Sequence, residues 1–249
     1  MKKFLRKIQP KTGFAGALHL AFTILLPILL YVFVRIDLPQ LAIATIILSK
    51  WRMFAVRPRY WLANIQANSV DIIVGLSAAI FMLQAGSQIW QLIWAIAYAM
   101  WLLLIKPGTS QLAISTQAFL AQTTGLMAIY LELGDSDTFV LVVMSWLICF
   151  AAARHFFSAF DEPLTRFLSS VWAFFAASLA WLLSHWLLFY GLVAQPVLIL
   201  SVLGLGLGSM YYLDDSNKLS VLVRRQMIFI MIAVMVVIIV FSSWGDKTV

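Results

Sequence analysis

The sequence predicts an all-α membrane protein, a polytopic bundle of about nine transmembrane helices with a cytoplasmic N-terminus and an outside C-terminus. The composition is the first reason: 63% of the 249 residues are hydrophobic and 11% are charged, whereas about 25% are charged in soluble domains. The second is a series of long apolar stretches, because roughly 20 helical residues cross the ~30 Å hydrocarbon layer. The third is the distribution of lysine and arginine between these stretches.

The apolar stretches nearly fill the chain, so we expect a single integral membrane domain over residues 1–249. No connecting loop is long enough to fold as a soluble domain. The predicted spans are 14–34, 38–56, 63–84, 88–105, 111–133, 138–155, 164–190, 192–213 and 226–244.

Basic residues are concentrated on one side of this arrangement. If every span crosses, 15 of the 17 lysines and arginines fall on the side of the N-terminus, and the exceptions are Arg35 and Lys247. Lysine and arginine are retained in the cytoplasm during insertion, so this side is cytoplasmic and the protein is expected in the plasma (inner) membrane. Insertion accounts for the net charge of +7, so we expect membrane lipids as partners and no nucleic acid.

Prolines mark the starts of most spans. Proline fits the first turn of a helix, where its missing N–H has no partner in any case. Those at or just before span starts are Pro10, Pro39, Pro58, Pro107, Pro163 and Pro196. Pro27 lies inside the first span, where it should bend the helix.

The second span, 38–56, has the least support, because its uncharged part is Leu38 to Ser49, about 18 Å of helix. A re-entrant segment is the alternative, but it would place the following basic residues outside. We therefore interpret it as spanning and expect the basic residues to contact anionic headgroups at the cytoplasmic face. These are Lys50, Arg52, Arg57 and Arg59.

Asp71 is the carboxylate deepest within a predicted span. A charge there costs about 2.5–3.5 kcal/mol on insertion scales, so it should have a partner. Asn64 and Asn68 share its helix face at steps of four and three residues. Ser115 and Gln122 form a similar polar face on the fifth span, and His19 lies at a comparable depth in the first. These residues predict a shared substrate or ion path, and polar bonding between helices without a ligand is the alternative.

Small residues recur on one face of the eighth predicted span. Ser201, Gly204 and Gly208 follow the small-xxx-small pattern that lets two helix backbones approach closely. Close helix packing is our interpretation. A flexible or broken helix is the alternative.

Motifs of hydrolases, phosphate-binding loops and metalloenzymes are absent from the sequence, so we assign no catalytic residue, metal site or cofactor. The acidic pair Asp161 and Glu162 could hold Mg²⁺ with phosphates, or be solvated loop charge. The stretch Arg57-Pro58-Arg59-Tyr60-Trp61-Leu62 resembles the entry to the first helix of UbiA-type prenyltransferases. That family has nine helices and inside-facing catalytic loops, but its aspartate-rich loops do not follow here.

Three functions remain open at this point. The leading hypothesis is a small transporter or lipid-handling protein with a polar intramembrane site near Asp71. The second is a prenyltransferase-like membrane enzyme acting on a lipid-linked phosphate at the cytoplasmic face, with Arg57 and Arg59 and with Mg²⁺ at Asp161 and Glu162. The third is a non-catalytic scaffold or assembly subunit, whose partner would be a second copy or another membrane protein.

Overall fold

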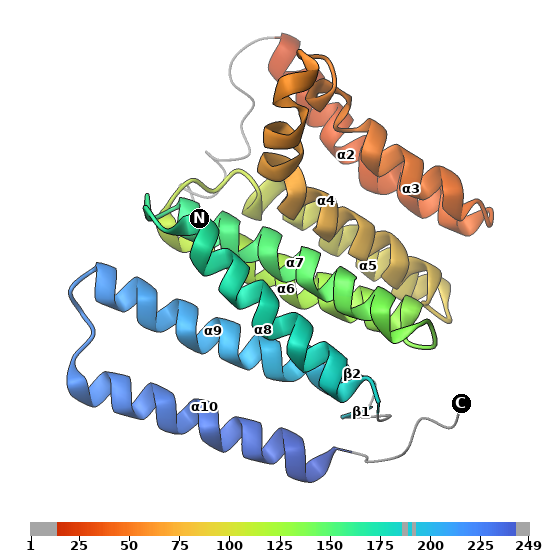
Figure 1. Ribbon diagram of the computed structural model, residues 1–249. Coiled ribbons are helices and arrows are strands. Elements are labelled where there is room, and N and C mark those ends of the chain that lie inside the picture. The colour runs from red at the N-terminus through yellow and green to blue at the C-terminus, as the bar shows by residue number, and fades with distance from the viewer. Residues whose placement is uncertain (1–13, 186–188, 191–192, 243–249) are drawn as a thin grey trace. The chain divides into compact units, whose positions relative to one another are not determined.

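The computed structural model describes residues 14–185, 189–190 and 193–242, and these residues are mostly helical, with connecting turns and one short hairpin (Figure 1). They contain nine α-helices, α2 to α10. The prediction of an all-α protein is therefore confirmed for the described part of the chain.

The chain divides into two compact units, one up to Thr109 and one from Ser110. The first contains α2 (Phe14–Arg35), α3 (Pro39–Leu48), the 3-10 turns η1 (Trp51–Met53) and η2 (Pro58–Tyr60), α4 (Trp61–Leu83), α5 (Gln88–Met100) and the π-helical turn η3 (Trp101–Ile105). The second contains α6 (Gln111–Leu133), α7 (Thr138–Ser158), α8 (Thr165–Leu183), β1 (Phe189–Tyr190), β2 (Val193–Ala194), α9 (Gln195–Asp215) and α10 (Val221–Phe241).

Seven of the described helices are long and apolar enough to cross a membrane. The first of them along the chain is Pro58–Leu83, which consists of η2 and α4. Large apolar side chains face outward on them: Phe229 on α10 is 73% exposed, and Phe174 on α8 is 71% exposed. An exposed apolar surface of this extent suits a hydrocarbon environment and not water. The chain is a multi-pass membrane protein.

The second predicted span differs most from the structure. Helix α3 ends at Leu48, and Lys50 to Tyr60 form turns in place of a helix that continues to residue 56. Ten helical residues rise about 15 Å, roughly half of the hydrocarbon thickness. The helix ends where the apolar run ends, and the Ser49 hydroxyl donates to the carbonyl of Ile46 at 2.6 Å.

Two later boundaries also differ from the predicted ones. Helix α8 ends at Leu183 and not at residue 190, because Ser184 Oγ donates to the carbonyl of Trp181 at 2.9 Å and the chain turns there. The antiparallel pair β1–β2 follows. Helix α10 begins at Val221 and not at residue 226, because the Ser220 hydroxyl accepts the N–H of Val223 at 3.2 Å and caps the helix.

Small residues bring the helices together within each unit. In the first unit, a Cβ added at Gly75 of α4 would lie 2.9 Å from Tyr98 Oη of α5 and 3.0 Å from Ile46 Cγ2 of α3. In the second unit, Ala173, Ala176 and Ala180 of α8 are fully buried. In a membrane the hydrophobic effect does not drive helices together, because the lipid is as apolar as the helix surfaces. Close van der Waals contact between helix backbones contributes this stabilisation instead.

Candidate functional site

The first unit contains a buried carboxylate. Asp71 is 7% exposed and lies on the buried face of α4 with Val70, Val74 and Gly75. This face results from the three- and four-residue spacing of the helix. The carboxylate thus lies among apolar and small side chains, where an unpaired charge would be costly.

Two lysines and a tryptophan hold this carboxylate. Lys50 Nζ forms an ion pair with Asp71 Oδ2, Lys106 Nζ lies 2.5 Å from the same oxygen, and Trp101 Nε1 donates to Oδ1 at 3.0 Å. The side chain of Lys50 is 10% exposed and that of Lys106 is 40% exposed. Both carboxylate oxygens therefore have donors, and the charged partners come from the ends of α3 and η3.

The π-helical turn brings Trp101 and Lys106 to the same side of their helix. In a regular α-helix, residues five apart point about 140° away from each other, because successive residues turn by 100°. Here the N–H of Lys106 donates to the carbonyl of Trp101 at 2.9 Å, an i→i+5 bond that widens the turn. Both side chains can then reach Asp71.

The lengths of the helices place Lys50 and Asp71 at similar depths. The chain advances about 16 Å along α3 from Pro39 to Lys50. On α4, Asp71 lies about 18 Å from Leu83, the residue at which that helix ends. Lys106 follows 18 residues of α5 and η3, about 27 Å, and its long side chain extends back toward the carboxylate. The half-length helix α3 therefore ends beside the buried acid.

The charges in this cluster are unequal. One carboxylate faces two amines, so the group carries excess positive charge when all three are ionised. Burial lowers the pKa of the Lys106 amine below its ordinary value of 10.5. The cluster can therefore be balanced by binding an anion or by releasing a proton.

The structure places the other predicted residues of the first unit as follows. Asn64 Nδ2 donates to the carbonyl of Met53 at 3.4 Å, and Asn68 Nδ2 donates to that of Asn64 at 2.9 Å. They lie on the helix face of Asp71 but bond to backbone. His19 is in α2, and its side chain, like that of Arg52, lies outside the described residues.

The basic residues assigned to lipid contact fall into two groups. The amine of Lys50 pairs with Asp71 and its side chain is nearly buried, and its contact with headgroups stays a prediction. Arg57 and Arg59 are exposed, and the guanidinium of Arg59 lies 4.5 Å from the centre of the Tyr60 ring. For Arg57 and Arg59, contact with anionic lipid stays a prediction.

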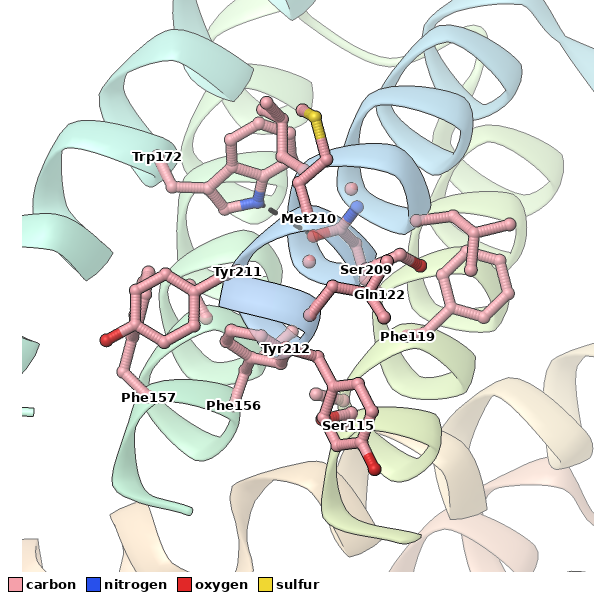
Figure 2. Close-up of a pocket in the computed structure, with 18 of the residues that line it drawn as sticks. Ser115, Phe119, Gln122, Phe156, Phe157, Trp172, Ser209, Met210, Tyr211 and Tyr212 are labelled. Atoms are coloured by element: carbon pink, nitrogen blue, oxygen red, sulfur yellow. Dashed lines mark hydrogen bonds between the residues drawn. The ribbon is translucent and has the colours of Figure 1, made fainter. Parts of the chain in front are cut away.

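Gln122 and Ser115 belong to the second unit, where they line a cavity (Figure 2). Gln122 is 5% exposed; its Nε2 donates to the carbonyl of Leu200 at 2.9 Å, and its Oε1 accepts from Trp172 Nε1 at 2.8 Å. Ser115 Oγ is buried and has no partner in the described residues. A path shared by these residues and Asp71 stays a prediction.

The small residues of α9 lie against other helices of the second unit. Ser201 Oγ is 2.9 Å from Thr123 Oγ1 of α6. A Cβ added at Gly204 would lie 2.7 Å from Gln122 Nε2, and one at Gly208 would lie 3.5 Å from the ring of Phe156. Gly204 therefore leaves the space that the Gln122 amide occupies.

Glu162, one of the two acidic residues considered for Mg²⁺, is engaged in local bonds. Glu162 Oε1 accepts the N–H of Leu164 at 3.3 Å, and its other oxygen accepts the hydroxyl of Tyr211. Within the described residues, no three histidine, cysteine or carboxylate side chains gather as metal ligands would. These contacts favour a structural role for Glu162.

Sequence reasoning missed Lys106, Trp101 and the cavity. A signal for the lysine existed, because a buried acid needs a cation. Lys50 and Lys106 directly follow the charge-free stretches on either side of the span that contains Asp71. No local pattern marks the π-helical turn. The bond between His155 and Gln117 Oε1, at 3.0 Å in the second unit, was also not predicted.

Comparison of the chain with models of protein families, with curated proteins and with solved structures finds no match.

Proposed function

We propose that the protein is a small transporter of the plasma (inner) membrane and that the cluster of Asp71, Lys50 and Lys106 is its intramembrane site for small anions. The observation that carries this proposal is the pairing of one buried carboxylate with two amines. Ionisable groups inside membrane proteins are expensive and commonly mark ion or substrate pathways.

The form of α3 supports the proposal. This helix ends beside Asp71, and turns continue the chain to α4. In many transporters, discontinuous helices end near the bilayer midplane and form the binding site there. In our proposed topology, α3 and the turns after it cross the membrane together, so nine crossings and a cytoplasmic N-terminus are retained.

The charge balance favours an anion as substrate. An anion that approaches Lys106, the more exposed amine, compensates the excess positive charge, while Asp71 keeps Lys50 in place. After the anion leaves, the amine of Lys106 returns to the carboxylate or loses its proton. The substrate is thus a small inorganic or carboxylate anion.

Flux into proteoliposomes tests this proposal. Wild-type protein should admit at least one of chloride, inorganic phosphate and acetate faster than protein-free vesicles. Asp71→Asn should reduce this flux at least tenfold, because Lys50 and Lys106 then lose the carboxylate that holds them in the site. Asp161→Asn, the same change at an exposed loop carboxylate, should not alter it. Chromatography in detergent checks that both variants remain folded. Absence of flux for all three anions, or equal flux through wild type and Asp71→Asn, overturns the proposal.

The pH dependence of flux tests the role of Lys106. Because burial lowers the pKa of this amine, flux should decline as the pH rises toward the ordinary lysine value and the amine loses its charge. Lys106→Arg keeps its charge throughout, so its flux should persist at alkaline pH. Identical profiles for wild type and Lys106→Arg would remove Lys106 from the site.

A further inference from the structure

The second unit contains a cavity of about 890 Å³ that the anion site does not use. Figure 2 shows its wall: Phe119 and Gln122 from α6, Phe156 and Phe157 from α7, and Trp172 from α8 surround the α9 residues Ser209 to Tyr212. Its volume lies within the range of ligand pockets, which are mainly apolar with a few polar groups.

The cavity is apolar at one end. Gly204 lines this end, and the nearby polar atoms of Gln122 and Trp172 are bonded to each other and to the carbonyl of Leu200. The amide of Gln122 therefore has neither its oxygen nor its nitrogen unpaired. A hydrocarbon chain suits such a surface better than a polar solute, which would lose its bonds to water.

The other end of the cavity carries two opposite charges. Asp214 of α9 and Arg224 of α10 both line it and are both exposed. Within the described residues no ion pair joins them. On α9, ten residues separate Gly204 from Asp214, which corresponds to about 15 Å along the helix.

This pattern matches an amphiphile with a zwitterionic headgroup. A guanidinium binds phosphate through parallel N–H bonds, and a carboxylate pairs with a primary amine. The charged end is formed around the α9–α10 loop, which carries Lys218, and the start of α10, which carries Arg225. The charge distribution predicts that this region lies at the cytoplasmic headgroup layer. The apolar end then lies at the depth of the acyl chains.

We propose that this cavity binds one phospholipid with an amine-bearing headgroup, its phosphate at Arg224, its amine at Asp214, and one acyl chain extending toward Gly204. A phosphoethanolamine lipid has this chemistry. The site does not depend on the anion site of the first unit. Its natural competitor is a phosphoglycerol lipid, which has the same phosphate and chains but no amine.

Native mass spectrometry of the full chain tests the proposal with phosphatidylethanolamine and phosphatidylglycerol of identical acyl chains, added to delipidated protein in mild detergent. Wild type should retain one phosphatidylethanolamine in preference to phosphatidylglycerol. Arg224→Gln should reduce retention of both lipids about tenfold, and Asp214→Asn should remove the preference between them. The matched controls Arg225→Gln and Asp215→Asn change neighbouring residues that do not line the cavity, and both should behave as wild type.

A third variant tests whether the lipid occupies the cavity. Ser115→Phe places a ring where Ser115 lines the cavity and should reduce retention of both lipids, with the melting temperature reporting whether the protein stays folded. If Ser115→Phe does not fold, the two headgroup variants and their controls decide. Equal losses in Arg224→Gln and Arg225→Gln, or no preference between the lipids in wild type, would overturn the proposal.

Discussion

At the scale of single residues, the pairing of Asp71 determines how its neighbours behave. Removing one partner of a buried ion pair costs about 3–5 kcal/mol, because the other charge is left without compensation, whereas replacing both by apolar groups is often neutral. Lys50 is the partner that burial constrains most, since its side chain is 10% exposed. Lys106 is more exposed and can turn toward the headgroups.

A double-mutant cycle on this pair is the first prediction. Asp71→Leu should lower the free energy of unfolding by about 3–5 kcal/mol, because Lys50 is then buried without its counter-charge. Lys50→Met should cost less, because Lys106 and Trp101 still hold the carboxylate. The double variant should recover most of the loss in Asp71→Leu, because the remaining amine, that of Lys106, is more exposed. Denaturant titration in mild detergent measures all four proteins. Losses that simply add in the double variant would contradict the pairing.

The second prediction concerns close packing at Gly75. An alanine there must displace Tyr98 Oη or Ile46 Cγ2, at 2.9 and 3.0 Å from the new Cβ, so Gly75→Ala should cost about 1–3 kcal/mol. Gly86→Ala is the matched control, because a Cβ at Gly86 has no neighbour within 4 Å. Melting temperatures in detergent compare the two, and equal values would show that α4 has room at Gly75.

The sequence singles out Asp71 but not its full set of partners. A carboxylate inside an apolar run is visible locally, because its cost does not depend on the rest of the fold. Lys50 and Lys106 are 21 and 35 residues away, and their snorkelling toward headgroups is just as consistent with the sequence. Only the packing of α3, α4 and α5 distinguishes pairing from lipid contact.

At the scale of elements, the site depends on how two helices end. Helix α3 stops early, and α5 widens into η3 before Lys106. The first ending could be anticipated, because charge-free residues run only to Ser49. The π-helical turn could not, since Trp101 to Ile105 are ordinary apolar residues of a span and only their tertiary contacts favour the wider turn.

The third prediction tests whether the π-helical turn η3 sets the angular position of Lys106 around its helix. Deleting Leu103 restores an α-helical count and leaves Lys106 four positions after Trp101, about 40° away around the axis. Inserting alanine after Leu103 places it six positions after Trp101, about 120° away. Anion flux should be retained in the deletion variant, in which Lys106 stays on the side of Trp101, and should be lost in the insertion variant. Proteoliposome flux measures both variants, and loss in the deletion with retention in the insertion would contradict the role of the π-helical turn.

At the scale of the whole molecule, the proposed membrane topology depends on the basic residues and on where the helices end. The 15-to-2 division of lysine and arginine assumes that the segment from Pro39 to Tyr60 crosses the bilayer, although α3 accounts for about half of the thickness. If that segment instead returned to the outside, every later loop would change sides. The loops after α3, α4 and α9 therefore distinguish the two arrangements.

The fourth prediction uses labelling with a membrane-impermeant maleimide in intact cells. The background is low, because the native Cys149 is 0% exposed. Gly86→Cys, between α4 and α5, should be labelled from outside. Ala55→Cys, after α3, and Lys218→Cys, after α9, should be labelled only once the membrane is permeabilised, because their loops carry the retained basic residues. Labelling of Ala55→Cys in intact cells would show that α3 returns to the outer side and that the proposed orientation is wrong.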